Sequence, residues 1–316
     1  MKLSIVATLY CSAQYVVEFC QRVSVIARNL VGEDFEIILV NDGSPDDSLN
    51  IAVELTRSNS QLVVIDLSRN FGHHKAMMAG LEFANGDLIY LIDIDLEEKP
   101  EWLGPFYAQI YADGADVVFG TQAERRGGLG ERLSGYLFYR LFRLLTDIKQ
   151  PNNITTARLM TKRYVESLLL HKEAEINIGG LWIITGFKQT TQIVKKNSTS
   201  PTTYNLSRKF SHFVNAITSF SSFPLILIFY SGVLISITAV IFISFLMLRY
   251  FITSSIPQGY TSLIASIWLF SGLIVLFLGI QGVYLSKIYI EVKRRPNTIV
   301  RQVYGKKSKY EVKNVY

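Results

Sequence analysis

The chain has 316 residues, of which 49% are hydrophobic and 18% are charged, and its formal net charge is +6 at pH 7. A charged fraction below the usual ~25%, together with this apolar content, excludes a disordered chain and argues against a purely soluble protein. The positive charge suits either a nucleic acid or an anionic membrane surface as the partner. Cys11 and Cys20 lack metal-ligand spacing and are too few for a disulfide scaffold, so we interpret them as free thiols in a reducing cytoplasm.

Short apolar runs alternate with helix-patterned segments in the N-terminal part of the chain. Runs rich in Ile, Val and Leu, without polar alternation, are typical of strands buried on both faces of a parallel sheet. The segments between them fit crossover helices, the second of which opens at Ser44-Pro45-Asp46-Asp47. The sequence therefore predicts a doubly wound α/β domain, whose ligands bind beyond the carboxyl ends of the strands. The predicted strands are Leu3–Leu9, Phe35–Val40, Leu62–Leu67, Leu88–Ile92 and Asp116–Gly120.

Two amphipathic segments follow the predicted sheet. Arg125 and Arg126 begin a basic loop, and the helix expected after it carries Arg132 beside an apolar leucine face. A second amphipathic helix is expected at 205–223, directly before an apolar segment. We expect this helix to lie in the bilayer interface, and the alternative is that it packs on the soluble domain.

The C-terminal third contains two apolar segments without charged residues, 225–248 and 261–286. Each exceeds the ~20 residues that are needed to span a hydrocarbon core. Basic residues dominate after the second segment, so the positive-inside rule places 288–316 in the cytoplasm as a tail. Two crossings return the chain to its starting side, which predicts a multi-pass protein with a cytoplasmic N-terminal domain. Because the excess cations lie beside a membrane span, a nucleic-acid partner is not expected.

The strongest chemical signal is Asp93-Ile94-Asp95, directly after the fourth predicted strand. Two carboxylates at a strand end supply the hard oxygen ligands that suit Mg²⁺ or Mn²⁺ bound to a diphosphate. A second signal is Asp42, which follows the second strand and can accept hydrogen bonds from a nucleobase or a ribose. The same Asn-Asp-Gly-Ser run is also ordinary strand-to-helix turn chemistry.

A third polar segment, Ser68 to Lys75, follows the third predicted strand and contains His73 and His74. Paired histidines beside a lysine suggest a metal or phosphate site, but with no third ligand in view we assign no metal to them. The chain has no Gly-x-Gly-x-x-Gly after its first strand and no Walker loop. This argues against dehydrogenases and phosphate-loop ATPases.

Taken together, these motifs resemble family 2 glycosyltransferases of GT-A fold, and among them the polyprenyl-phosphate glycosyltransferases that include dolichyl-phosphate mannose synthases. The resemblance covers the whole chain, including Arg158-Leu159 and the juxtamembrane run Ile217–Ser221. Two C-terminal spans occur in a bacterial branch, which implies a bacterial inner membrane. The implied division is a cytoplasmic GT-A (Rossmann-like) domain at 1–204, an interfacial helix at 205–223, a transmembrane hairpin at 224–287 and a basic tail at 288–316.

The resemblance also implies roles for individual residues. Asp93, Asp95 and Arg158 would be the catalytic residues, and Asp93, Asp95 and Glu97 would hold Mg²⁺ or Mn²⁺. The acceptor phosphate would be held by Arg125, Arg126 and Arg132. The nucleotide sugar would be bound by Thr8, Tyr10, Asp42, Ser68, Asn70 and Asp93. The resemblance allows a homo-oligomer but does not fix the oligomeric state.

Two motifs depart from the family pattern. The usual Pro-x-Tyr-Asn-Glu is Thr8-Leu9-Tyr10-Cys11-Ser12 here, so an amide and an acid are missing. The usual Gly-Asp-Phe-Arg is Thr155-Thr156-Ala157-Arg158, so the acidic residue is replaced by Thr156.

The resulting hypothesis is an inverting transfer of a sugar from a nucleotide-diphosphate sugar to a polyprenyl phosphate at the cytoplasmic leaflet. A phosphate monoester is largely a dianion at pH 7 and needs little help from a base, so the loss of an acid at position 156 is tolerable. One alternative acceptor is a hydroxyl of a lipid-linked glycan in cell-surface polysaccharide synthesis, which requires a base such as Glu97, Glu98, Glu173 or Glu175. Another alternative is a non-catalytic membrane scaffold that binds nucleotide sugars.

Overall fold

The computed structural model describes residues 2–122, 153–196, 221, 223–253 and 259–305. These residues fall into two compact units, an α/β domain that includes residues 295–305 and a unit of apolar helices. The predicted basic loop with Arg125 and Arg126, the helix with Arg132, and nearly all of the predicted 205–223 helix lie outside the described residues.

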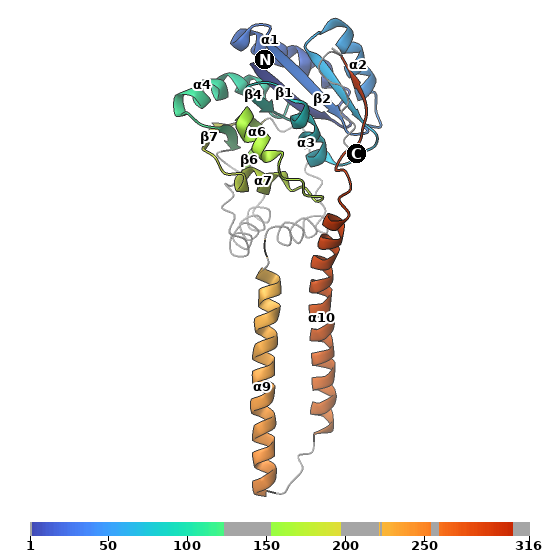
Figure 1. The fold of residues 1–316 in the computed structure, drawn as a ribbon, viewed down its shortest axis with the longest axis vertical. Helices are drawn as coiled ribbons and strands as arrows, with labels where there is room; N and C mark the ends of the chain where they lie inside the picture. Colours follow the sequence, from blue (N-terminus) through green and yellow to red (C-terminus); the bar gives the residue numbers. More distant parts are fainter. Residues whose placement is uncertain (1, 123–152, 197–220, 222, 254–258, 306–316) are drawn as a thin grey trace. The chain divides into compact units, whose positions relative to one another are not determined.

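An eight-stranded sheet forms the centre of the α/β domain, in the order β7-β5-β6-β4-β1-β2-β3-β8 (Figure 1). The five predicted runs form β1 to β5 in the predicted places, and β1 to β4 are buried along their whole length. The strands are β1 (Leu3–Leu9), β2 (Phe35–Asn41), β3 (Leu62–Leu67), β4 (Leu88–Leu91), β5 (Val117–Gln122), β6 (Ile154–Thr161), β7 (Gln189–Val194) and β8 (Val300–Tyr304).

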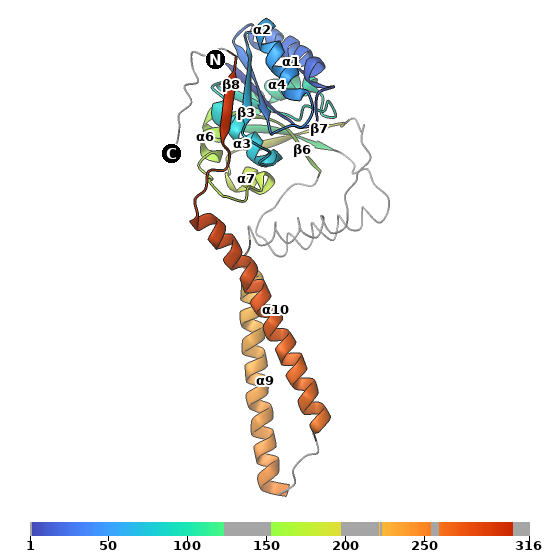
Figure 2. The ribbon, with the colours of Figure 1, turned by 90° about the vertical axis from the view of Figure 1, so that its right-hand side faces the viewer.

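Helices cover both faces of this sheet (Figures 1 and 2). Successive strand residues point to opposite faces, so Leu3 and Ile5 of β1 belong to one hydrophobic core and Val6 belongs to the other. The first core is completed by α1 (Val16–Val31), α2 (Ser48–Ser58), the short helix η1 (Pro100–Trp102) and α4 (Leu103–Asp113). The second core is completed by α3 (His73–Phe83), α6 (Lys162–Leu168) and α7 (Ile178–Ile184).

The sheet is mixed: the central strands are parallel, and antiparallel strands that were not predicted flank them on both sides. The four strands β4, β1, β2 and β3 pair in parallel as predicted. However, β6 lies between β4 and β5 and is antiparallel to both, and β8 is antiparallel to β3. Leu91 at the end of β4 pairs with Arg158, so Ile154 to Ala157 of β6 extend past the end of β4. This extension forms one wall of the site described below.

The predicted tail contains the edge strand β8. Ser68 donates its backbone N–H to the carbonyl of Ile299 at 2.9 Å, which continues the pairing of β8 with β3. Gly305 at the end of the strand has a φ of +106°, and a Cβ there would lie 2.5 Å from the carbonyl oxygen of Leu62. The chain therefore returns to the α/β domain after the apolar helices.

The second unit contains two long helices, α9 (Phe223–Thr253) and α10 (Tyr260–Val292), at the two predicted apolar segments. Among the described residues, one stretch, Ser266–Val292, is long and apolar enough to cross a membrane by length and composition, and Phe223–Ile235 is a shorter apolar stretch. The Tyr284 hydroxyl donates to the carbonyl of Ser221 at 2.7 Å, which links α10 to the start of α9. One candidate span is thus identified, and the two-helix membrane hairpin stays a prediction.

Candidate active site

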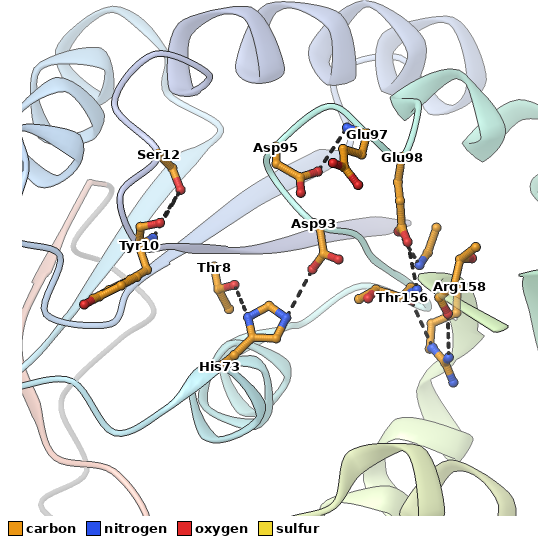
Figure 3. Close-up of polar contacts among 12 residues, drawn as sticks. Thr8, Tyr10, Ser12, His73, Asp93, Asp95, Glu97, Glu98, Thr156 and Arg158 are labelled. Atoms are coloured by element: carbon orange, nitrogen blue, oxygen red, sulfur yellow. Dashed lines mark hydrogen bonds and ion pairs between the residues drawn. The ribbon is translucent and has the colours of Figure 1, made fainter. Parts of the chain in front are cut away.

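Polar side chains gather where β1, β2 and β4 end, which is the edge of the sheet that the sequence predicted. Figure 3 shows Thr8 at the end of β1 near His73, and Asp93 on the other side of His73. Asp95 and Glu97 lie in the turn that follows Asp93, and Glu98 points from this turn toward Thr156 of β6. The predicted residues from β1 and β4 are therefore brought together.

Asp42 anchors the loop that follows β3. It is only 3% exposed, and its two carboxylate oxygens accept the backbone N–H groups of Phe71 at 2.7 Å and of Gly72 at 3.0 Å. Burial raises the pKa of Asp42, although these two hydrogen bonds oppose the shift. Gly43 has a φ of +60°, and a Cβ there would lie 2.5 Å from the Asn70 nitrogen. Asp42, which was predicted to bind the nucleotide, thus fixes the loop that carries Ser68 and Asn70, two further residues predicted to bind it.

A second anchor for this loop comes from β8. The Arg301 guanidinium donates to the carbonyl of Ser68 at 2.6 Å and lies 3.3 Å from Oδ2 of Asp66. Asp66 is 1% exposed, and its other oxygen accepts from the Asn41 amide at 2.8 Å. The loop is therefore fixed by a residue that follows the apolar helices in the sequence.

His73 connects the end of β1 with the acid pair. Its Nδ1 lies 3.0 Å from the Thr8 hydroxyl, and its Nε2 lies 3.2 Å from Oδ1 of Asp93. Burial lowers the pKa of His73, but the hydrogen bond and charge of Asp93 outweigh it, so the net shift is upward. Burial raises the pKa of Asp93, but His73 outweighs burial there too, and the net shift is downward. Both shifts favour a His73–Asp93 ion pair, which the sequence analysis did not predict.

The acidic turn after Asp93 is closed by one backbone contact and one lysine. Oδ1 of Asp95 accepts the backbone N–H of Glu97 at 3.0 Å, and burial raises the pKa of Asp95. Nζ of Lys196 lies 3.3 Å from Glu97 and 3.7 Å from Glu98. Burial lowers the pKa of Lys196, but the surrounding carboxylates outweigh it and raise the pKa. Lys196 therefore supplies a positive charge that partly balances this acidic turn.

Glu98 ties the acidic turn to β6. It is 1% exposed, and its oxygens accept the backbone N–H groups of Thr156 at 3.0 Å and of Ala157 at 2.7 Å. Burial and the charge of Asp93 raise the pKa of Glu98 to about 7. From the sequence, Glu98 is only a candidate base, because no local pattern indicates a backbone partner so distant in the sequence.

Arg158 braces β6 from inside the domain. It is 1% exposed, its guanidinium donates to the carbonyls of Thr155 and Thr156 at 3.1 Å each, and it lies over the Trp182 ring. Burial lowers its pKa to about 9. These contacts give Arg158 a structural role, and its catalytic role stays a prediction.

The turn after β1 shows what replaces the missing family acid. The Ser12 hydroxyl donates to the carbonyl of Tyr10 at 3.0 Å and accepts the Tyr10 backbone N–H at 3.2 Å. Tyr10 is 52% exposed. Ser12 therefore closes the turn and leaves the Tyr10 ring at the surface beside the site.

The acid pair fits a divalent cation that is shared with a diphosphate. Such a cation takes one or two protein carboxylates and completes its shell with phosphate oxygens and water. Asp93 and Asp95 supply these two carboxylates, and Oδ1 of Asp93 is held by Nε2 of His73 at 3.2 Å. Among the described residues, no three His, Cys, Asp or Glu residues cluster as ligands, and Glu97 is engaged by Lys196.

An acid after β2, an acid pair after β4 and a Rossmann-like mixed sheet are features of GT-A glycosyltransferases. Residues 4–169 match the model of glycosyl transferase family 2, and the chain belongs to this family and is a glycosyltransferase. A glycosyltransferase of Mycobacterium tuberculosis is 47% identical, over 96% of this chain and 89% of the relative. A prophage bactoprenol glucosyl transferase homolog of Escherichia coli K12 is 31% identical, over 96% of this chain and 99% of the relative. Among solved structures, a mannosyltransferase of Pyrobaculum calidifontis in complex with GDP-mannose and Mn²⁺ is 13% identical, with a TM-score of 0.48 over 93% of this chain and 86% of that one.

Proposed function

We propose that this protein transfers a sugar, with inversion at the anomeric carbon, from a nucleotide-diphosphate sugar to a polyprenyl phosphate at the cytoplasmic face of a bacterial inner membrane. The observation that carries the proposal is the acid pair Asp93 and Asp95 beside the Asp42 turn, at the sheet edge where such folds bind ligands. The Escherichia coli relative, which matches along nearly its whole length, is named for a bactoprenol glucosyl transfer.

Different residues at this edge of the sheet would bind the nucleotide and the diphosphate of the donor. Ser68 and Asn70 lie in the loop anchored by Asp42 and, with Thr8 and Tyr10, would contact the nucleotide. Asp93 and Asp95, with Glu97 as a further candidate, would hold Mg²⁺ or Mn²⁺, which supplies charge neutralisation of the departing diphosphate when bound. His73 keeps Asp93 ionised through the ion pair described above.

The acceptor is argued from the carboxylates that are in place. A hydroxyl acceptor needs a base that can reach it. Glu98 is buried and accepts two backbone N–H groups, and Glu97 faces Lys196. A polyprenyl phosphate is already a dianion near pH 7 and requires no such base. We therefore favour the phosphate acceptor, with the predicted Arg125, Arg126 and Arg132 as its ligands.

The pairing of β8 with β3 supports two membrane crossings. Residues 2–122 and 295–305 belong to one folded unit, so the chain between them leaves that unit and returns to it. A folded domain lies on one side of a membrane, so the number of crossings must be even. If Ser266–Val292 of α10 crosses once, a second crossing is required, and α9 is the described helix that can provide it.

The experiment is a product assay on the full chain in detergent or lipid vesicles. UDP-, GDP- and dTDP-sugars are offered with undecaprenyl phosphate, and products are read by mass spectrometry. We expect a glycosylated lipid phosphate from the wild type and a loss of about 100-fold or more in Asp95→Asn. Asp87→Asn, an exposed aspartate before β4, is the control and should keep full activity. Binding without any transfer would instead favour the scaffold, and transfer to hydroxyl acceptors alone would refute the phosphate acceptor.

A further inference from the structure

The turn after β1 is held in place by the segment that opens α2. Three successive backbone N–H groups of the turn donate to three side chains of that segment. These hydrogen bonds join Cys11 to Oγ of Ser44 at 2.8 Å, Ser12 to Oγ of Ser48 at 2.9 Å and Ala13 to Oδ2 of Asp46 at 3.0 Å. Cys11 has a φ of +52°, and a left-handed residue in a turn brings successive N–H groups to one side, where an anion can accept them.

Asp46 is the carboxylate on which all three hydrogen bonds converge. Its Oδ1 accepts the hydroxyl groups of Ser44 and Ser48 at 2.5 Å each, and its Oδ2 accepts from Ala13 directly. Hydrogen bonds to an ionised acceptor are roughly twice as strong as neutral ones. Burial raises the pKa of Asp46, but these hydrogen bonds outweigh it and lower the pKa to about 2. One ionised side chain therefore fixes the whole turn.

The turn carries the Tyr10 ring, which is predicted to bind the nucleotide. Half of the ring is exposed, so its orientation depends mainly on the backbone of the turn. Both backbone polar groups of Tyr10 are engaged by the Ser12 hydroxyl, and Ser12 is held by the fully buried Ser48. A shift of Ser12 would therefore release Tyr10.

The same short segment also fixes the second nucleotide loop. Asp42 accepts two backbone N–H groups of the loop that contains Ser68 and Asn70, as described above. Asp46, four residues later, holds the turn that contains Tyr10. The two parts of the chain that are predicted to contact the nucleotide are thus positioned by one turn after β2.

We propose that Asp46 is a positioning residue for the donor, which acts through Ser44 and Ser48 to hold Tyr10 where its ring contacts the nucleoside. The inference rests on the proposed function, because it needs a nucleotide beside the β1 turn. Asp46 itself touches no substrate. If the turn adopts this conformation only part of the time, the apparent affinity for the nucleotide falls by that fraction.

The test compares two ligands on the full chain with Mn²⁺ present. One is the nucleoside diphosphate that binds most tightly among UDP, GDP and dTDP, and the other is inorganic pyrophosphate, which lacks the nucleoside. Asp46→Asn has one acceptor oxygen in place of two and cannot keep both Ala13 and the two hydroxyls. We expect the dissociation constant of the nucleoside diphosphate to rise about fivefold to tenfold, with that of pyrophosphate unchanged.

The adjacent Asp47 provides the matched control. Its carboxylate accepts from the Asn50 side chain at 2.7 Å and is exposed like that of Asp46. Asp47→Asn removes the same charge one residue away, so both dissociation constants should stay within about twofold of the wild type.

A double-mutant cycle shows whether the effect passes through Tyr10. In a Tyr10→Ala background, Asp46→Asn should cause no further loss of nucleoside diphosphate binding, because the ring that it positions is absent. A general weakening of the domain would instead lower affinity equally in both backgrounds.

A milder pair of variants guards against misfolding. Ser44→Ala removes the acceptor of the Cys11 N–H and should raise the dissociation constant about threefold, whereas Ser44→Thr keeps a hydroxyl and should restore it. Slow thiol labelling of the buried Cys20, 5% exposed, confirms that each variant is folded.

Three outcomes would overturn the inference. One is an equal result for Asp46→Asn and Asp47→Asn, another is a full effect of Asp46→Asn in the Tyr10→Ala background, and the third is an equal loss of pyrophosphate binding in folded variants. The failure of the proposed function looks different, because the wild type would then bind none of the nucleoside diphosphates and use no nucleotide sugar in the product assay.

Discussion

Replacing Glu98 with glutamine should change how the stability of the α/β domain depends on pH. The carboxylate is 1% exposed and accepts two backbone N–H groups of β6. A glutamine can accept only one of them and turns its own NH₂ toward the other. An unsatisfied buried donor costs about 1–3 kcal/mol, so at pH 8, where Glu98 is ionised, the variant should be less stable than the wild type by about that amount.

The pH-dependent part follows from the raised pKa. The ordinary pKa of the group is 4.5, and the folded domain raises it to about 7. Between these values the folded state holds a proton that the unfolded chain has lost, so the stabilisation is complete below pH 4.5 and is lost as the pH rises through 7. From pH 5 to pH 8 the loss is about 2–3 kcal/mol. The stability advantage of the wild type over Glu98→Gln should shrink by this amount.

The chain carries its own probe for this measurement. Its two cysteines are Cys11, which is exposed, and Cys20, which lies on the buried face of α1. In a Cys11→Ser background, the rate at which a pyridyl disulfide labels Cys20 reports the free energy of opening the domain. Comparing both proteins at each pH cancels the intrinsic reactivity of the thiol, and Glu54→Gln, an exposed site on α2, is the control.

The reasoning would be refuted by a stability difference that stays constant or widens from pH 5 to pH 8. Such a result would mean that Glu98 is already ionised at pH 5. Its two backbone donors and Lys196 would then compensate the buried charge fully.

Three further predictions concern the metal, the topology and β8. Removing divalent cations with EDTA should abolish transfer, and Mn²⁺ or Mg²⁺ should restore it; full activity in EDTA would contradict the metal assignment of the acid pair. In intact cells, an impermeant thiol reagent should label a cysteine placed at Ser254, between α9 and α10, but not one placed at Gln302 of β8; the opposite pattern would reverse the topology. Arg301→Ala should raise the donor KM about fivefold, a loss of about 1 kcal/mol, with a smaller change in kcat, whereas Gln302→Ala should change neither; equal effects would remove Arg301 from the support of the nucleotide loop.

The strands β1 to β4 could be predicted because each is buried on both faces and is therefore a continuous apolar run. The strand β6 lacks that signature, since Thr155, Thr156 and Arg158 interrupt it. Thr155 and Arg158 are buried, and Arg158 is satisfied by carbonyls of its own strand and by the Trp182 ring. A buried strand is recognised in a sequence by its run of apolar residues. A strand whose polar residues are buried through tertiary contacts has no such run and therefore cannot be predicted in this way.

The site shows the same division. Asp42, Asp93 and Asp95 could be placed at one edge, because the carboxyl ends of parallel strands meet there and all three residues directly follow such strands. The positive charges that balance these three carboxylates could not be placed from the sequence. Lys196 comes from the end of β7, and its approach to Glu97 depends on the order of strands in the folded sheet. His73 was noticed as a candidate ligand, but its pairing with Asp93 required the geometry of the α3 start.

The position of β8 in the sequence also determines when the sheet can be completed during synthesis. During synthesis, β1 to β7 leave the ribosome before the apolar helices, and β8 leaves after them. Until then β3 is an open edge with unpaired backbone groups, which is the kind of edge that invites pairing with other chains. The α/β domain can close this edge only once both helices have been synthesised. A chain cut after Val292 would keep every acid of the site and lose Arg301, so its failure would appear as self-association and a loosened nucleotide loop.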